Sequence, residues 1–469
     1  MTATPETARS ETDTPDAGAP PTVRTVLALA LPVVLANAAV PLQGAIDTAI
    51  IGNLGDTTLL AAIALGASGV ILVFSSCNFL QMGISGTTAQ AFGAGRPERV
   101  VNTLMRGVIL ALGAAALIIL LKPVLLWALL ALFAASDAAE TAAAAYIRIR
   151  LWGAPFELMN YALMGWFTGL GLTRRLFELQ LIVSVVNVAM TLILVVGLGW
   201  GIEGVAIGTI IGHATACAWG GWQARRQLWA LMPGGYRPDW RRLFRGEEIG
   251  ALLTLNRDIF VRTVLLSFSF AWVARLGSIQ GDEVLAANGV LMEFFFVTSH
   301  ACDGITMAAE SLVGRAIGAR SPARLRIAVR VCAMAAALFA VGLSLVLAPL
   351  GEPIVALFTN VQEIREVAGH YVLWAAFFPV AGIGAFLMDG IFIGAADGRT
   401  MRNAMVVSAG LFLPSGWLMT MAFGNHGLWA AVWGFLLLRA LTLYLAYPAL
   451  EARVAAASTS APTAASAEA

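Results

Sequence analysis

The sequence is poor in charge. Aspartate, glutamate, lysine and arginine make up only 12% of its 469 residues, whereas apolar residues make up 59%. Mean hydropathy is +0.80. A soluble chain of this length needs many more polar residues to cover its surface. The composition therefore excludes a soluble globular protein and predicts an all-α polytopic membrane protein.

Patterns typical of several other functional classes are missing. The single lysine, Lys122, lies in an apolar run, and the chain has no phosphate-binding glycine loop or Walker lysine. ATP is thereby excluded as the direct energy source, and we expect neither an enzyme nor a cofactor. The net charge of +1 says nothing about nucleic acid, because the arginines serve membrane topology, and we expect no nucleic-acid partner. The cysteines at 77, 217, 302 and 332 lack CxxC spacing, which predicts neither disulfides nor a metal site.

Apolar stretches long enough to cross a bilayer as helices recur along the whole chain. They predict six spans per half, at 24–51, 58–92, 99–133, 139–168, 176–198, 202–226, 247–275, 283–317, 324–350, 362–395, 401–423 and 426–450. Prolines inside these spans are expected to kink their helices, among them Pro32 and Pro41 in the first.

The two halves repeat each other at an offset of 225 residues. Segment Gln90–Arg99 is nearly copied as Arg315–Arg324, and Gly165-x-x-x-Gly169 recurs as Gly390-x-x-x-Gly394. Matches in one order at one offset indicate a duplication. Six spans return the chain to its starting side, so we expect two pseudo-symmetric six-helix lobes related by an axis along the membrane normal.

The spans also set the domain boundaries. We expect an N-lobe at 24–226, a cytoplasmic linker at 227–246 and a C-lobe at 247–451, with disordered cytoplasmic tails at 1–23 and 452–469. Arginines gather in alternate loops, for example at 96, 99, 174, 175, 320, 324, 399 and 402. The positive-inside rule then predicts a multi-pass protein of the inner (plasma) membrane with both termini in the cytoplasm.

Carboxylates inside the spans are the main functional candidates, because each costs about 2.5 to 3.5 kcal/mol at a helix centre. They are Asp47, Asp258, Glu293, Asp303, Glu310 and Asp389. Asp47 lies toward the outer end of the first span. It either exchanges a proton within the physiological range or stabilises helix packing.

The other candidates have structural alternatives too. Asp303 and Glu310 are seven residues apart and share a helix face, where they bind a cation or pair with Arg262 or Arg315. Asp389 precedes the second GxxxG pattern, which favours a role in helix packing.

Three motifs together resemble a known family. Residues 300–319 (HACDGITMAAESLVGRAIGA), 388–394 (MDGIFIG) and 46–52 (IDTAIIG) are similar to the DinF branch of the multidrug and toxic compound extrusion (MATE) transporters. The resemblance covers about residues 24–450. It implies a twelve-helix exporter that exchanges H+ or Na+ for organic, often cationic or amphipathic, compounds across a central cleft.

The resemblance also implies a coupling site in the N-lobe. The family's first-helix aspartate, fifth-helix asparagine and sixth-helix threonine correspond to Asp47, Asn187 and Thr209, and Thr191 stands where the family has a second carboxylate. With one carboxylate, protonation of Asp47 is the simplest coupling step, while Na+ held by the four side chains stays open. Pro32 matches the proline at which the family's first helix bends, and Pro41 lies between it and Asp47.

Two other functions are compatible with parts of this pattern. A lipid-intermediate flippase shares the paired lobes but needs basic cavity residues, for which Arg262 and Arg275 are candidates. A scaffold or receptor leaves six intramembrane carboxylates without purpose. We therefore expect an H+-coupled antiporter of small organic substrates that contacts membrane lipid and acts as a monomer.

Overall fold

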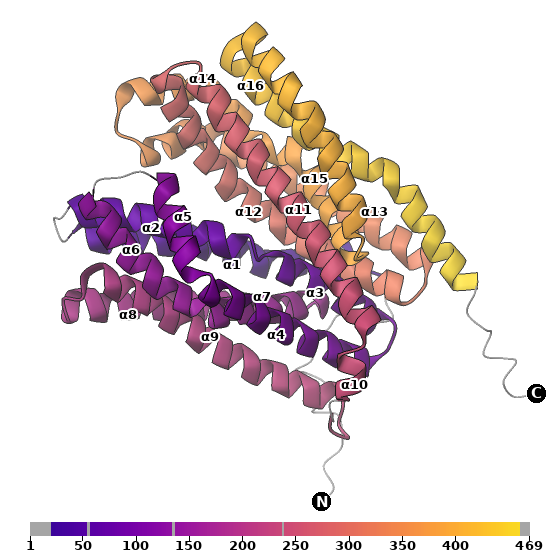
Figure 1. Cartoon of the computed structure of the whole chain (residues 1–469). Coiled ribbons are helices and arrows are strands. Elements are labelled where there is room, and N and C mark those ends of the chain that lie inside the picture. Colours follow the sequence, from indigo (N-terminus) through magenta and orange to yellow (C-terminus); the bar gives the residue numbers. More distant parts are fainter. Residues whose placement is uncertain (1–19, 54–56, 134–136, 237–238, 460–469) are drawn as a thin grey trace, which may run out of the picture.

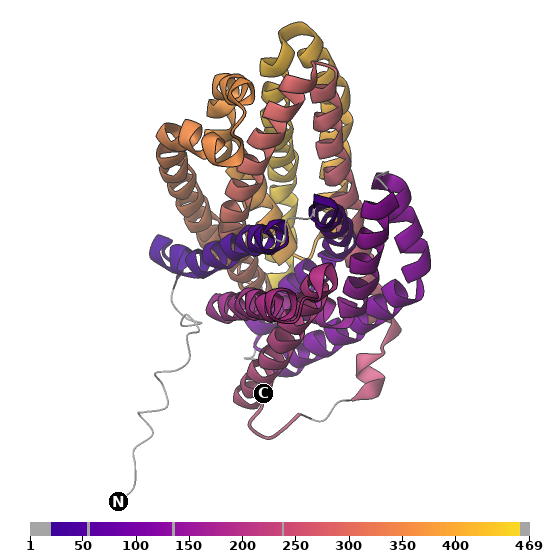
Figure 2. The same cartoon turned by 90° about the vertical axis from the view of Figure 1, so that its left-hand side faces the viewer.

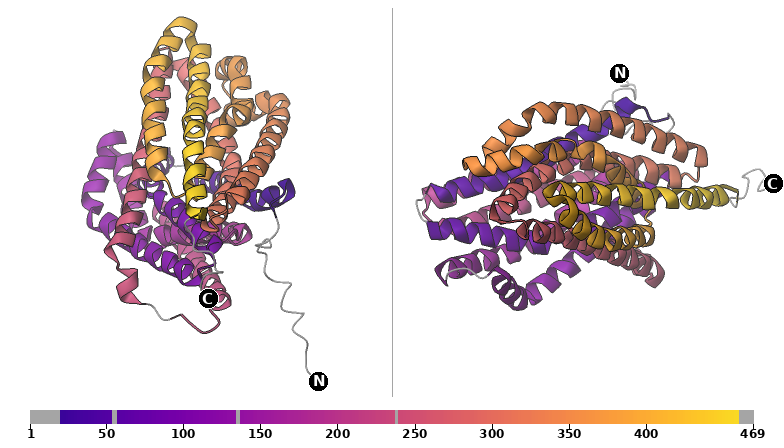
Figure 3. Two further views of the ribbon diagram at one scale, coloured as in Figure 1. Left: turned by 90° about the vertical axis from the view of Figure 1, so that its right-hand side faces the viewer. Right: turned by 90° about the horizontal axis from the view of Figure 1, so that it is seen from above.

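The computed structural model describes residues 20–53, 57–133, 137–236 and 239–459. Regular structure in these ranges is helical throughout, without a strand. Figure 1 shows the helices of the first half, indigo to magenta, in one bundle and those of the second half, rose to yellow, in another. Figure 2 and the left view of Figure 3 show the same division from either side, and in the right view of Figure 3, from above, the second half lies over the first. The predicted all-α fold of two lobes is confirmed.

The N-lobe begins with α1 (Val23–Gly52), which Thr22 caps by accepting the Thr25 N–H at 3.2 Å. It continues with α2 (Thr57–Ser75), α3 (Phe79–Gly93), α4 (Pro97–Leu120), α5 (Lys122–Phe133), α6 (Asp137–Arg150), α7 (Ala154–Gly169), α8 (Thr173–Thr191) and α9 (Gly201–Leu231). A 3₁₀ turn, Leu151–Gly153, joins α6 to α7, and a π-helical turn, Leu192–Gly197, extends α8.

The C-lobe follows a short linker helix, α10 (Trp240–Leu243). Its helices are α11 (Gly246–Ser278), α12 (Asp282–Gly318), α13 (Pro322–Phe358), α14 (Gln362–Ala376), α15 (Phe378–Gly394) and α16 (Gly398–Thr459). Pro322 stands at the first turn of α13, where the absent proline N–H costs nothing, and Ser321 caps it.

These helices make up the twelve predicted spans. Among the described residues, nine helical runs are long and apolar enough to cross a membrane, and α14 with α15, bent by 42°, makes a tenth. Within α16, Gly424 has φ 59° and ψ −139°, which divides it into two spans. The run from α6 to α7 lies where the span at 139–168 is predicted, but it is not among the runs that are long and apolar enough by these criteria.

Helices α3 and α12 cross where the two lobes meet. A Cβ on Gly318 would lie 2.0 Å from the carbonyl oxygen of Gln90, and a Cβ on Gly93 would lie 2.1 Å from that of Arg315. Gly93 and Gly318 are 225 residues apart, and so are Gln90 and Arg315. The two contacts are therefore equivalent, and the helices touch backbone to backbone as only glycine permits.

Ser85 and Glu310 mark the pseudo-twofold axis itself. They too are 225 residues apart, and the Ser85 hydroxyl donates to Glu310 Oε2 at 2.6 Å. A residue that contacts its own counterpart in a twofold arrangement lies on the axis. The backbone repeats as well, since Gly95 (φ 63°) corresponds to Arg320 (φ 49°). We call the end of the molecule that carries Arg96, Arg99 and Arg320 the arginine end.

Helix α1 belongs to both lobes. Val26, Leu29 and Ala30 near its start pack in the C-lobe core with residues of α12, α13, α15 and α16. Ile51 near its end packs in the N-lobe core. Between them, the Asn37 amide donates to the carbonyl oxygen of His300 in α12 at 3.0 Å. The helix that carries Asp47 is thus a direct link between the lobes.

The structure corrects the predicted tail and linker boundaries. Residues 452–459 are helical rather than disordered, because this alanine-rich stretch favours helix, Val454 is buried, and Arg453 pairs with Asp397. Helix α9 likewise continues to Leu231, into the predicted linker. Residues 1–19 and 460–469 of the predicted tails lie outside the described residues.

Gly318→Ala tests the lobe contact. The added Cβ has no room against the Gln90 carbonyl, so the helices must move apart, at a cost of about 1 to 3 kcal/mol in the free energy of unfolding. Gly289→Ala in the same helix is the matched control, because a Cβ there meets nothing within 4 Å. We expect a lower Tm for purified Gly318→Ala in detergent and an unchanged or slightly higher one for Gly289→Ala. Equal melting temperatures would contradict the contact.

Candidate functional site

The four residues predicted to form the N-lobe coupling site do lie together. The Thr191 hydroxyl donates to Asp47 Oδ1 at 3.3 Å. The Asn187 amide nitrogen donates to Thr209 Oγ1 at 2.8 Å, and that hydroxyl donates to the Val205 carbonyl at 2.9 Å. All four side chains are buried, and Asp47 is 8% exposed. Within the described part of the chain, Asp47 makes no ion pair.

Glycines of α9 bring these side chains together. A Cβ on Gly212 would lie 2.8 Å from the Val183 carbonyl of α8, and one on Gly208 would lie 2.9 Å from Thr191 Oγ1. Helices α8 and α9 therefore pack closely enough for Asn187 to reach Thr209. The Asn187 carbonyl oxygen, Oδ1, is buried without a hydrogen-bond partner. The site thus holds a free acceptor beside its carboxylate.

A second polar cluster lies deeper in the N-lobe. Arg150 donates to Glu157 Oε2 at 2.9 Å and lies over the Phe74 ring at 5.4 Å. His213 Nε2 is 3.8 Å from the same carboxylate oxygen, and the Asn160 amide donates to the His213 carbonyl at 3.0 Å. Arg150 also attracts Asp47 electrostatically. The sequence interpretation missed this cluster, although an arginine inside the predicted span 139–168 was a signal for it.

In the C-lobe, Asp389 holds two arginines. Arg262 of α11 and Arg439 of α16 both donate to its Oδ2, the latter at 2.6 Å, and all three residues are at most 5% exposed. Asp389 therefore joins α11, α15 and α16 by a buried ion triad. The GxxxG packing role is present as well, since a Cβ on Gly390 would lie 2.5 Å from the Thr306 carbonyl.

Asp303 and Glu310 do not form the ion pairs with Arg262 or Arg315 that the sequence suggested as one alternative. Arg262 is taken by Asp389, and the Arg315 guanidinium donates to the Leu170 carbonyl in the other lobe. Glu310 accepts from Ser85, whereas half-buried Asp303 makes no ion pair among the described residues and lies in the field of Arg262 and His300. The alternative in which either carboxylate pairs with Arg262 or Arg315 is therefore wrong.

The remaining candidates do not join either cluster. Asp258 is buried and accepts from Arg402 of α16 at 2.7 Å and from Arg257 at 3.1 Å, which makes it a structural cross-link. Glu293 is exposed on α12. Helix α1 runs without a break through Pro32, and the side chain of Pro41 lies outside the described residues. Bending at these prolines stays a prediction.

Comparison with known proteins agrees with this architecture. The sequence profile of the MatE family matches residues 32–193 and again residues 259–418, once in each lobe. The chain is 36% identical to DNA damage-inducible protein F of Escherichia coli over 88% of this chain and 90% of that protein. It is 25% identical to the multidrug resistance protein MdtK of Yersinia enterocolitica, covering 87% and 91% of the two chains.

Solved structures give the same fold. The bent form of the Vibrio cholerae MATE transporter VcmN superposes with a TM-score of 0.82, covering 92% of this chain and 97% of that one at 20% identity. A family profile that matches both lobes, a relative at 36% identity over nearly the whole chain and the shared fold agree with one another. This multi-pass membrane protein therefore belongs to the multidrug and toxic compound extrusion (MATE) family of transporters, on its DinF branch.

Proposed function

We propose that this protein exports small organic compounds, often cationic or amphipathic, in exchange for inward-moving H+. Membership of a multidrug efflux family supports the export of organic substrates. The observation that carries the choice of ion is the environment of Asp47, a buried carboxylate whose hydrogen bond comes from a neutral hydroxyl. One proton removes the cost of that buried charge without leaving a cation unpaired.

Burial of Asp47 and an unsatisfied acceptor, rather than the hydrogen bonds that Asp47 accepts, support a proton over a metal ion. A carboxylate only accepts hydrogen bonds, whereas a protonated carboxyl also donates one. The unpartnered Asn187 Oδ1 is suited to accept that bond. Protonation therefore satisfies a buried acceptor while it removes the charge. Coordination of Na+ by Asp47, Asn187, Thr191 and Thr209 is the alternative, since hydroxyl and amide oxygens also suit a hard cation.

In the proposed transport cycle the lobes move relative to each other by alternating access. The positive-inside rule places the arginine end in the cytoplasm, so the described arrangement, in which α3 and α12 touch at that end, is closed to the cytoplasm. Protonation of Asp47 changes the contacts of α1 in the N-lobe. Since α1 is also anchored in the C-lobe core, its movement reaches both lobes.

The flippase alternative has less support. Its pyrophosphate substrate requires free basic side chains within the membrane-spanning helices, but there Arg262 and Arg439 share Asp389 and Arg150 pairs with Glu157. Arg275 is exposed near the end of α11, where its guanidinium donates to Ser278 at 3.3 Å. We further propose a monomer in the inner membrane, with both termini in the cytoplasm and no catalytic activity of its own.

Asp47→Asn tests the coupling step. The amide cannot exchange a proton in this range, so we expect efflux driven by a pH gradient in proteoliposomes to fall to the rate of protein-free liposomes. Glu293→Gln is the matched control, since it neutralises an exposed carboxylate in another helix. Full pH-driven efflux by Asp47→Asn would refute the role of Asp47. Efflux by the unmodified protein under a Na+ gradient alone would instead establish Na+ coupling.

Thr191→Asp tests whether the single carboxylate of the site is the reason that it binds H+ rather than Na+. It places a second carboxylate beside Asp47 and raises the site charge to −2, which favours binding of a metal cation. We expect Na+ to raise the Tm of Thr191→Asp relative to N-methylglucamine and to leave the unmodified protein unchanged. Thr191→Asn, of the same size without the charge, should behave like the unmodified protein. A Tm increase by Na+ in all three proteins would contradict the choice of H+.

A further inference from the structure

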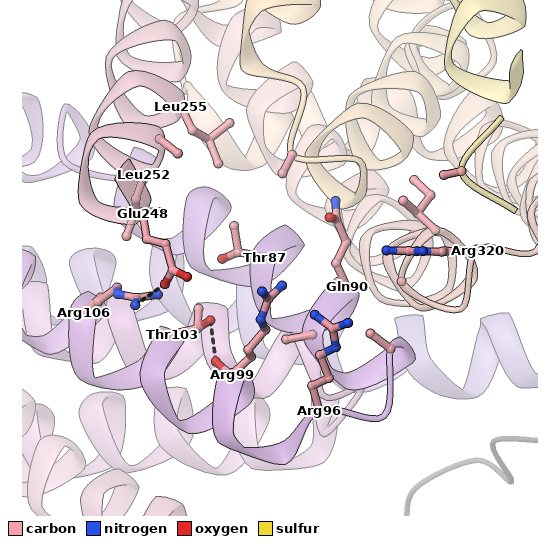
Figure 4. A pocket seen from close by; sticks show the side chains of 17 residues that line it. Thr87, Gln90, Arg96, Arg99, Thr103, Arg106, Glu248, Leu252, Leu255 and Arg320 are labelled. Carbon is pink, nitrogen blue, oxygen red and sulfur yellow. Dashed lines mark hydrogen bonds and ion pairs between the residues drawn. The ribbon is translucent and has the colours of Figure 1, made fainter. Parts of the chain in front are cut away.

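A pocket of about 600 Å³ lies between the lobes at the arginine end. The N-lobe lines it with residues of α3 and α4, including Thr87, Gln90, Arg96 and Arg99. The C-lobe lines it with residues of α11, the end of α12 and the turn after α12, which holds Arg320. In Figure 4, Arg96 and Arg99 extend toward Gln90 from one side and Arg320 from the other. The pocket is distinct from the Asp47 site, which lies near the opposite end of α1.

The charge of this pocket is unbalanced. Four arginines line it together with one carboxylate, Glu248. Arg106 pairs with Glu248 and also donates to the Leu243 carbonyl at 3.2 Å. The guanidinium groups of Arg96, Arg99 and Arg320 have no carboxylate in the lining left to pair with. Three positive charges therefore line one pocket from both lobes. Their mutual repulsion is relieved when an anion binds between them.

Arg320 holds its position at a cost. Its φ of 49° lies in the left-handed region, where a side chain is unfavourable, and its counterpart in the N-lobe repeat is Gly95 with φ 63°. One copy of the turn thus has the unstrained residue, while the copy at the pocket has an arginine. Ala396 (φ 53°), which also lines the pocket, replaces Gly171 (φ 66°) in the same way, so both C-lobe turns beside the pocket hold a strained residue. Gln90 is fixed as well, since its amide donates to the Gly394 carbonyl of the other lobe at 2.9 Å.

The chemistry of the lining selects the ligand. Guanidinium groups bind phosphate oxygens through two parallel hydrogen bonds. Leu252, Leu255 and Ile317 add an apolar wall beside the arginines, which suits a phosphate attached to an apolar group. We propose that this pocket binds a phosphate group, carried by an anionic phospholipid or a soluble phosphate compound, and that the bound phosphate holds the lobes together at the arginine end.

The effect on conformation follows from the position of the pocket. Arg99 belongs to the N-lobe and Arg320 to the C-lobe, so a phosphate that contacts both binds only while the lobes meet here. A ligand that binds one arrangement better shifts the population toward it. Phosphate therefore stabilises the described arrangement and slows the transition that separates α3 from α12.

Phosphate binding is measured on the full-length protein in nanodiscs. One arm uses neutral phosphatidylcholine discs titrated with inorganic phosphate or glycerol 3-phosphate, followed by thermal shift. The other uses discs with one quarter phosphatidylglycerol, followed by native mass spectrometry of retained lipid. Dependence on the arginines in the first arm identifies a soluble phosphate compound as ligand, and in the second arm alone it identifies the lipid.

The variant Arg99→Gln/Arg320→Gln should bind the phosphate ligand about 25-fold more weakly than the unmodified protein. Each arginine contributes roughly fivefold to the affinity for an anionic headgroup. Arg225→Gln/Arg399→Gln is the matched control, since it removes two exposed arginines outside the pocket lining. Arg99→Lys/Arg320→Lys keeps both charges but lacks the planar guanidinium group that forms two parallel hydrogen bonds. Its affinity for phosphate should lie between those of the glutamine variant and the control. If the pocket and control variants bind equally, or if neither arm shows binding to the unmodified protein, the proposal is wrong. A melt without phosphate verifies that each variant folds.

Discussion

Backbone contact between α3 and α12 determines how the two lobes meet. Gly93 and Gly318 each admit the carbonyl of the partner helix, and Ser85 donates to Glu310 between them on the axis. The lobes cannot separate at the arginine end without breaking this bond and exposing a buried carboxylate. Helices α11 and α15 pack against both α3 and α12, and α1 packs against α12, so a movement of one lobe against the other also changes these contacts.

The buried charges divide into two groups with different consequences. Arg262 and Arg439 depend on Asp389, so removing the charge of that carboxylate leaves two buried guanidiniums unpaired. Asp47 and Glu310 accept instead from the hydroxyls of Thr191 and Ser85, and losing their charge strands no cation. Among the buried carboxylates of the described residues, a change of charge is therefore least costly at these two. One lies in the N-lobe site, and the other lies on the axis between the lobes.

The sequence was sufficient for the fold because its strongest signals are local or repeated. Apolar length predicts spans, and the 225-residue offset predicts the symmetry on which Ser85 meets Glu310. The family resemblance selected four N-lobe side chains that do lie together around Asp47, while their role in coupling stays a prediction. Partners such as Arg439 for Asp389 depend on which helices pack together, which no local pattern specifies. The prediction of disorder after residue 451 was wrong for a similar reason. Tertiary contacts of Val454 and Arg453 stabilise the C-terminal end of α16, a segment that composition alone assigns to disorder.

Helix α1 relates the two proposed binding events. Asp47 lies near one end of α1. Val26, near the other end, packs in the C-lobe core with residues of α12, and the end of α12 lines the pocket at the arginine end. If a proton at Asp47 favours one arrangement of the lobes and phosphate favours the other, each ligand weakens the binding of the other by the same factor. Phosphate at the arginine end then acts on transport without contacting substrate or proton. Its influence is limited to its differential affinity for the two arrangements, which in this proposal arises because a phosphate contacts Arg99 and Arg320 together only while the lobes meet.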